Sequence, residues 1–171
     1  MTQVSVVAPD GGEAIQLGPI QMRILEDGQT TGHRLGVGEI TIPPGIAGPP
    51  QHRHAEHDEG FYVVSGTARF TVGDTSYDAA PGTLVMVPPG APHTFANPGE
   101  EPVVLLNTFT PDLYVRYFRD LGQMIADGTN YFSISPWIAV VPGSMIALIV
   151  LALNLFGDGL RDIFDPRVRR S

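Results

Sequence analysis

Glycine and proline divide the first 110 residues of the chain into short segments. The whole sequence has 171 residues and holds 20 Gly and 16 Pro, without the regular period of a collagen. Between these residues lie short runs that suit β-strands, such as QMRILEDG, GFYVVSG and TLVMVPPG. Turn signals about every 8–12 residues are typical of a β-sandwich or a small barrel. We therefore expect an all-β domain over residues 1–110.

The types of charged and sulfur-containing residues exclude several functions. The chain has no Cys, so disulfides, thiolate metal sites and Cys nucleophiles are excluded, and a bound metal must be held by His and carboxylate groups. All ten basic residues are Arg, and the net charge is −8. A nucleic-acid-binding protein needs a basic surface to neutralise phosphates, so we expect no nucleic-acid partner.

The distribution of charge divides the chain near residue 130. Fifteen of the 18 acidic residues precede this point, and no charged residue lies between Asp127 and Asp158. Residues 138–156 form an apolar run unlike anything earlier in the chain. We expect a linker over 128–135 and a separate hydrophobic segment over 136–171.

A helix is expected over 111–127, directly after the β-domain. Thr110 suits the N-cap and Pro111 the first helical position. Apolar residues recur every fourth position from Leu113 to Ile125, as on one face of an amphipathic helix. Such a helix would pack on or beside the β-domain, or at a subunit interface.

Four of the five histidines lie between residues 52 and 93. His52 and His54 alternate on an extended segment, so their side chains project from the same face and can reach one ion. Glu59 follows after a short loop. We expect His57, between them, to be a solvated loop residue, with contact to a metal ligand or proton transfer as the alternative. We expect His33 to be partly buried on a strand.

Two stretches of the sequence resemble the two conserved motifs of the cupin superfamily. The first is His52-x-His54-x4-Glu59-x6-Gly66. The second is Gly82-x5-Pro88-x-Gly90-x2-His93-x3-Asn97, and 15 residues separate the two. One departure is Ile46, which stands where the first motif has Gly; Gly45 or Gly48 would then supply the turn.

This resemblance implies a double-stranded β-helix, the jelly-roll barrel of the cupins, with one divalent ion bound inside by His52, His54, Glu59 and His93. Four protein ligands leave positions open for water or substrate on a five- or six-coordinate ion. The donor types admit Fe, Mn, Ni, Cu or Zn and do not choose among them.

The strand period also predicts what surrounds the ion. If Glu59 points inward, Phe61 and Val63 do so too, and Phe95 follows His93 by the same rule. The predicted pocket is apolar and partly aromatic, which suits a small ligand that carries a metal-chelating oxygen group. The alternative is that these side chains only fill a small barrel.

The C-terminal segment has the length and composition of a membrane-spanning helix. Residues 138–156 would span about 28 Å as a helix, close to the roughly 30 Å hydrocarbon core of a bilayer. The stretch over 136–170, with its N-x-x-G-D-x-L-R-D-x-x-D-P ending, resembles the C-terminal end of the permease subunits of peptide-type ABC transporters. The N-terminus does not resemble a secretory signal. We expect a cytoplasmic β-domain with an inner-membrane association through 138–156.

Three functions remain open at this point. The first is a metal-dependent, dioxygenase-like enzyme similar to bacterial quercetinase-type cupins, with Glu59 also acting as a catalytic base. The second is a cupin that binds or senses a small molecule without turnover. The third is a membrane-associated fusion of a cupin with a permease fragment, without transport activity. Each is compatible with a homodimer.

Overall fold

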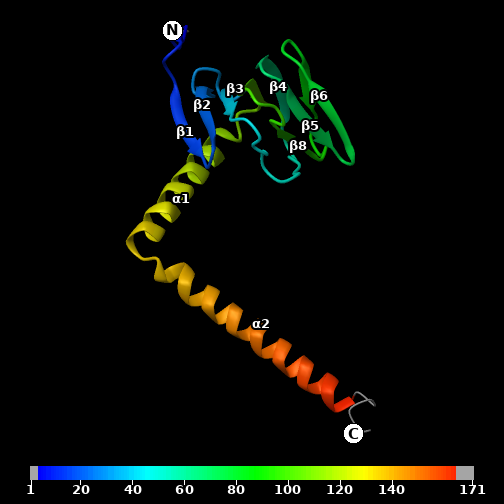
Figure 1. The fold of residues 1–171 in the computed structure, drawn as a ribbon. Helices are drawn as coiled ribbons and strands as arrows, with labels where there is room; N and C mark the ends of the chain where they lie inside the picture. The colour runs from blue at the N-terminus through cyan, green and yellow to red at the C-terminus, as the bar shows by residue number, and fades with distance from the viewer. Residues whose placement is uncertain (1–3, 165–171) are drawn as a thin grey trace. The chain divides into compact units, whose positions relative to one another are not determined.

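The computed structural model describes residues 4–164, which divide into two compact units at Ile125 and Ala126. The first unit is built of antiparallel strands (Figure 1). The strands are β1 (Glu13–Leu17), β2 (Ile20–Asp27), β3 (Gly36–Ile42), β4 (Asp58–Ser65), β5 (Ala68–Val72), β6 (Thr75–Ala79), β7 (Leu84–Val87), β8 (His93–Ala96) and β9 (Val103–Thr110). These elements confirm the all-β prediction for this part of the chain.

Two sheets form the barrel. The larger has the order β1-β2-β3-β9-β4-β7 and the smaller the order β6-β5-β8. Isolated bridges from Ala47 to Ala96 and from His52 to His93 add the segment over 47–52 beside β8. Strands distant in sequence are therefore neighbours, as in a jelly roll.

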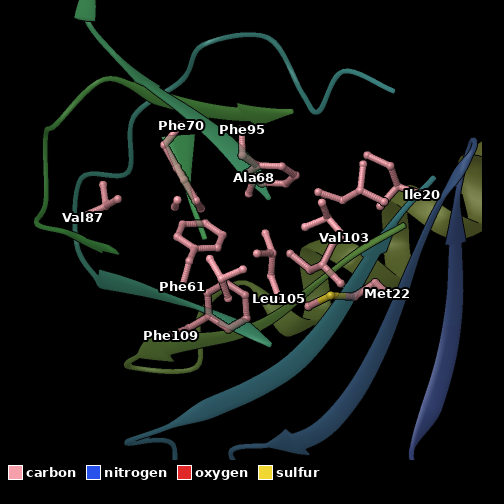
Figure 2. Close-up of a cluster of buried hydrophobic side chains, with 14 of the residues drawn as sticks. Ile20, Met22, Phe61, Ala68, Phe70, Val87, Phe95, Val103, Leu105 and Phe109 are labelled. Atoms are coloured by element: carbon pink, nitrogen blue, oxygen red, sulfur yellow. The ribbon is translucent and has the colours of Figure 1, made fainter. Parts of the chain in front are cut away.

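The core lies between the two sheets and follows the two-residue period of the strands. Every second residue of β9 from Val103 to Phe109 is buried. Figure 2 shows Phe61, Phe70 and Phe95 close together in this core, with ring centroids 5.3 Å apart for Phe61 and Phe70 and 5.5 Å apart for Phe61 and Phe95. The described core residues all come from residues 15–115.

Both glycines near Ile46 contribute to the turn that the sequence left open. Gly45 has a φ of +69°, a conformation that favours glycine. At Gly48, a Cβ would lie 2.4 Å from the carbonyl oxygen of Phe95, so the backbone passes too close to β8 for any side chain. The Ile46 departure therefore leaves the loop intact.

Helix α1 (Val115–Ile134) begins and ends later than the sequence predicts. Thr110 is not its N-cap, because that residue pairs with Asp58 as the last residue of β9; the first turn instead has the Val115 N–H donating to the Asp112 carbonyl. Residues 128–134, expected to be a linker, continue the helix. They contain no Pro and one Gly, so nothing in them terminates helical hydrogen bonding.

The second unit contains helix α2 (Trp137–Phe164), which confirms the expected hydrophobic helix. Its stretch Ala139–Arg161 is long and apolar enough to cross a bilayer, by length and composition alone. The final Asp-Pro of the permease-like ending and the basic residues after it lie outside the described residues.

His33 differs from its expected place on a strand. It lies in the loop before β3 with a φ of 63°, and its side chain is 75% exposed. The loop turns back at this point, since the His33 N–H donates to the Gly28 carbonyl. Its Nδ1 lies 2.8 Å from Asp112 Oδ2, and this carboxylate raises the pKa of His33.

Candidate metal centre

Three segments of the barrel bring the expected ligands together. His52 and His54 lie on the connection between β3 and β4, Glu59 near the start of β4, and His93 at the start of β8. Reciprocal backbone hydrogen bonds of 3.0 and 2.8 Å join His52 to His93. One ligand atom from each of the four side chains lies within 4.8 Å of the others, and all except the half-buried His52 are buried. The cluster is suited to holding a metal ion.

Glu59 is at the centre of this cluster. Its Oε2 lies 2.9 Å from His54 Nε2 and 3.0 Å from His93 Nε2. Its Oε1 accepts a hydrogen bond of 3.1 Å from Asn107 Nδ2, which also donates to the Gly60 carbonyl at 3.1 Å. Asn107 thus fixes the carboxylate from the side opposite the histidines.

Asn107 lies outside the two His/Glu motifs that indicate the other residues of the site. A signal was available, because Asn107 occupies a buried position of β9 between Leu105 and Phe109. A polar residue at such a position needs a hydrogen-bond partner in the interior.

These contacts set the charge of the site. Burial raises the pKa of Glu59, but the contacts with His54, His93 and Asn107 outweigh burial and lower it to about 2. Burial lowers the pKa of His93, but the contacts with Glu59 and the Ala91 carbonyl outweigh it and raise the value. The carboxylate is therefore anionic at neutral pH, as a metal ligand must be.

Backbone carbonyls orient two of the imidazole rings. His52 Nδ1 lies 2.9 Å from the Pro50 carbonyl oxygen and His93 Nδ1 lies 3.1 Å from that of Ala91. A carbonyl only accepts hydrogen bonds, so each Nδ1 carries a hydrogen and each Nε2 is directed to the cluster. Metal-binding histidines are commonly held by such outer contacts.

His54 provides a further test of the fit. Its Nε2 is close to Glu59 but lacks the alignment of a hydrogen bond, and neither of its ring nitrogens has a hydrogen-bond partner. Buried polar atoms without partners are uncommon and call for an explanation. A divalent cation between the imidazoles and the carboxylate would satisfy the Nε2 lone pair.

His57 is not the solvated residue that the sequence predicts. It is 2% exposed, and its ring centroid lies 4.3 Å from that of His54 and 4.5 Å from that of Tyr114. Tyr114, which follows β9, also lies against His54 at 4.3 Å. A side chain 57 residues further along the chain thus helps to enclose His57, and no local pattern indicates this contact.

A cavity of about 610 Å³ adjoins the cluster. It is lined mainly by apolar side chains from β1 to β3, from the segment over 47–54 and from the start of α1, and it includes Phe95 as expected. Phe61 and Val63 do point inward, but both are fully buried in the core and do not line this cavity. The barrel is filled at their level by Phe70 and Phe109, so the pocket lies towards β1 and β2 instead.

A short segment of the chain, 29% of its length, is similar to peptide transporter permeases. A probable peptide ABC transporter permease of Sinorhizobium fredii is 51% identical over 49 residues, which are 29% of this chain and 17% of that protein. The oligopeptide permease OppC of Mycobacterium bovis is 49% identical over 49 residues. The dipeptide permease DppC of Haemophilus influenzae is 39% identical over 51 residues. The chain thus spans about a sixth of the length of these relatives.

The barrel is similar to solved cupin structures. KdgF from Halomonas has a TM-score of 0.56 at 22% identity, covering 63% of this chain and 94% of its own. An RmlC-like cupin from Shewanella frigidimarina has a TM-score of 0.54 at 24% identity, covering 65% and 95%. A predicted oxalate decarboxylase from Thermotoga maritima has a TM-score of 0.57 at 19% identity, covering 63% and 99%. At these low identities, the TM-scores show a shared fold and nothing further. The cupin domain family model matches residues 38–109, and together with these structures it shows that the N-terminal unit has the jelly-roll fold of the cupins.

Proposed function

We propose that the cupin domain is a metal-dependent, dioxygenase-like enzyme that acts on a small aromatic or apolar substrate bearing oxygen groups. The observation that supports this proposal is that a possible metal-binding cluster and an apolar lining occur in the same cavity. Three imidazoles and a carboxylate converge within 4.8 Å, and apolar side chains line the space beside them. Pockets of this composition bind apolar ligands that a few polar groups orient.

In this proposal His52, His54, Glu59 and His93 hold one divalent ion. When bound, such an ion supplies Lewis-acid activation of substrate oxygen atoms. The carbonyls of Pro50 and Ala91 hold two of the rings in the ligating tautomer. The apolar lining keeps water from the bound substrate and strengthens polar interactions at the site.

Glu59 has two proposed roles, and its environment favours one of them. A pKa of about 2 suits an anionic ligand. A general base works best with a pKa near the operating pH, so at neutral pH Glu59 would be a weak one. We propose the ligand role as the main one, with acceptance of a proton from a substrate hydroxyl as the secondary role.

The test starts with the purified full-length chain, reconstituted without oxygen with Fe(II), Mn(II), Ni(II), Cu(II) or Zn(II). Elemental analysis then gives the metal content, and an oxygen electrode follows uptake with catechols, flavonols and oxo-acids. We expect about one ion per chain and oxygen consumption with an aromatic member of the panel. Saturable binding without turnover of any kind would replace this proposal with that of a binding or sensing cupin.

We further propose that α2 associates this chain with a membrane. Its apolar stretch has the length of a bilayer span. The similarity of the chain to permeases covers about 49 residues, too few to include a transport pathway. In the cell, we expect the full-length chain in the inner-membrane fraction, resistant to alkaline carbonate extraction. Recovery in the soluble fraction would contradict a membrane association.

A further inference from the structure

We propose that one face of α1 determines which ligands the cavity accepts, by contacting the part of the ligand that is distant from the metal centre. We call Tyr117, Leu121 and Ile125 the α1 wall. This inference rests on the proposed function, because it takes the ligand to be bound through oxygen at the His/Glu cluster. It adds a second requirement on the ligand. Beyond the oxygen group that binds at the cluster, the ligand must carry an apolar or aromatic part, which we call its body.

The α1 wall lines the same cavity as the metal cluster. Tyr117, Leu121 and Ile125 contribute to its surface, and so do His54 and Glu59. The three wall residues are spaced by four positions, so they lie on one face of the helix. A ligand that binds at the cluster and extends through the cavity therefore meets this face.

The α1 wall does not serve the barrel core. Tyr114 and Phe118 of the same region pack against the core cluster, but Tyr117 and Leu121 do not belong to it. Tyr117 is 51% exposed, although its ring lies near those of Tyr114 and Phe118. Covering such apolar surface is favourable in proportion to the area removed from water, and a ligand in the cavity can supply that cover.

The barrel holds the wall in a fixed position. Arg119 donates hydrogen bonds to Glu13 of β1 at 2.8 Å and to Asp27 of β2 at 3.0 Å. One turn along the helix, a Cβ on Gly122 would lie 2.5 Å from the Ile15 side chain, so the helix lies directly on β1. A wall placed by two strands that also line the cavity is preorganised for one ligand shape.

The cavity size supports a ligand with an apolar body. A volume of about 610 Å³ is within the range of small-molecule sites. A chelator without such a body would occupy the cluster and leave Tyr117 and Leu121 uncovered. We therefore infer that aromatic chelators bind more tightly than aliphatic chelators with the same metal-binding group.

The experiment uses two hydroxamates that differ only in their body. Benzohydroxamate and acetohydroxamate are titrated into the Zn-loaded full-length chain by calorimetry, for the wild type, Tyr117→Ala and Leu121→Ala. Met124→Ala is the matched control, because Met124 lies on the same helix, is 69% exposed and does not line the cavity. We expect each wall variant to weaken benzohydroxamate about tenfold and to leave acetohydroxamate unchanged, with no effect of Met124→Ala.

Equal effects of the wall variants on both hydroxamates, or no effect on either, would overturn the role of the α1 wall while leaving the metal centre intact. A second measurement tests the α1 wall independently of metal binding, in case the chain binds no metal. The fluorescence of 1-anilinonaphthalene-8-sulfonate is titrated with the metal-free wild type and the same variants, in which α2 provides a constant background. A loss of dye binding in Tyr117→Ala and Leu121→Ala supports the wall even if neither hydroxamate binds, and an unchanged signal overturns it. Circular dichroism of each variant, with Leu121→Met as a conservative replacement, separates a local effect from unfolding.

Discussion

At the scale of single residues, Glu59 is the point at which the side chains of the His/Glu cluster meet, and this cluster is suited to holding a metal ion. The carboxylate contacts two imidazoles through Oε2 and an amide through Oε1, so one side chain connects three strands or loops. Removal of any of these three contacts is expected to change both the pKa and the orientation of the Glu59 carboxylate. Three predictions belong to this scale.

The first prediction concerns the ligands. His52→Ala and His93→Ala should each abolish binding of about one divalent ion per chain, because each removes one of four converging donors. Metal analysis after anaerobic reconstitution measures the loss, and the variants should melt lower than the wild type mainly when metal is present. His33→Ala is the control, since His33 is exposed and outside the cluster. A wild-type chain that takes up no metal would contradict the site.

The second prediction concerns Asn107. Asn107→Leu removes the hydrogen bonds to Glu59 and Gly60, so metal affinity should fall about 10- to 100-fold and stability by about 1–3 kcal/mol. Competition with a chromophoric chelator measures the affinity. The control is Asn97→Leu, because Asn97 is also buried but donates only to backbone carbonyls outside the cluster. It should cost stability without a comparable loss of metal, and equal losses in both variants would refute the role of Asn107.

The third prediction concerns pH. The pKa of Glu59 is lowered from its usual 4.5 to about 2, so in the metal-free chain this group stabilises the fold above about pH 4.5 and loses that contribution as the pH falls towards 2. The melting temperature of the metal-free wild type should therefore approach that of Glu59→Gln as the solution is acidified. A difference between the two that stays constant with pH would show that Glu59 is not ionised in the fold.

At the scale of elements, two strands that follow the same inward period end in different surroundings. Phe61 of β4 is fully buried in the core, whereas Phe95 of β8 is 8% exposed and lines the cavity. Helix α1 shows a related difference, because Phe118 packs against the core as well as lining the cavity, whereas Tyr117 lines the cavity without belonging to the core cluster. Inward-facing side chains of similar type therefore differ in whether they contact only the core or also the cavity.

This division gives a fourth prediction. Phe61→Ala should destabilise the domain by about 3–5 kcal/mol, as a large-to-small core substitution. Phe95→Ala should instead change ligand affinity more than metal affinity, since its ring borders the cavity and cannot ligate an ion. Denaturant unfolding and hydroxamate titration on the two variants distinguish these effects. Loss of metal in Phe95→Ala would show that the ring supports the cluster rather than the pocket.

At the scale of the whole molecule, the chain consists of two units with different chemistry. The unit up to Ile125 contains the metal cluster and the cavity. The second unit contains an apolar helix of bilayer length. The described core draws only on residues 15–115, so the barrel has its packing within the first unit.

The fifth prediction follows from this separation. A chain that ends after Asp127 should fold, remain soluble and bind metal with the affinity of the full-length protein, because it keeps the core, the cluster and the α1 wall. Circular dichroism, gel filtration and metal analysis of both proteins make the comparison. Unfolding of the shorter chain or loss of its metal would show that the second unit contributes to the barrel.

The sequence by itself determined the features that depend on local order along the chain. Turn residues at short intervals predict strands, and the apolar run over 138–156 predicts a hydrophobic helix. The alternation of His52 and His54 places both on one face, and the resemblance to the cupin motifs adds Glu59 and His93 as further ligands. Only the tertiary structure decided which side chains meet across the barrel. Asn107 supports Glu59 from another strand, Tyr114 encloses His57 from beyond β9, and the face of α1 borders the cavity. A two-residue period says that a side chain points inward, but whether it meets core or cavity depends on how the opposite sheet fills that level of the barrel.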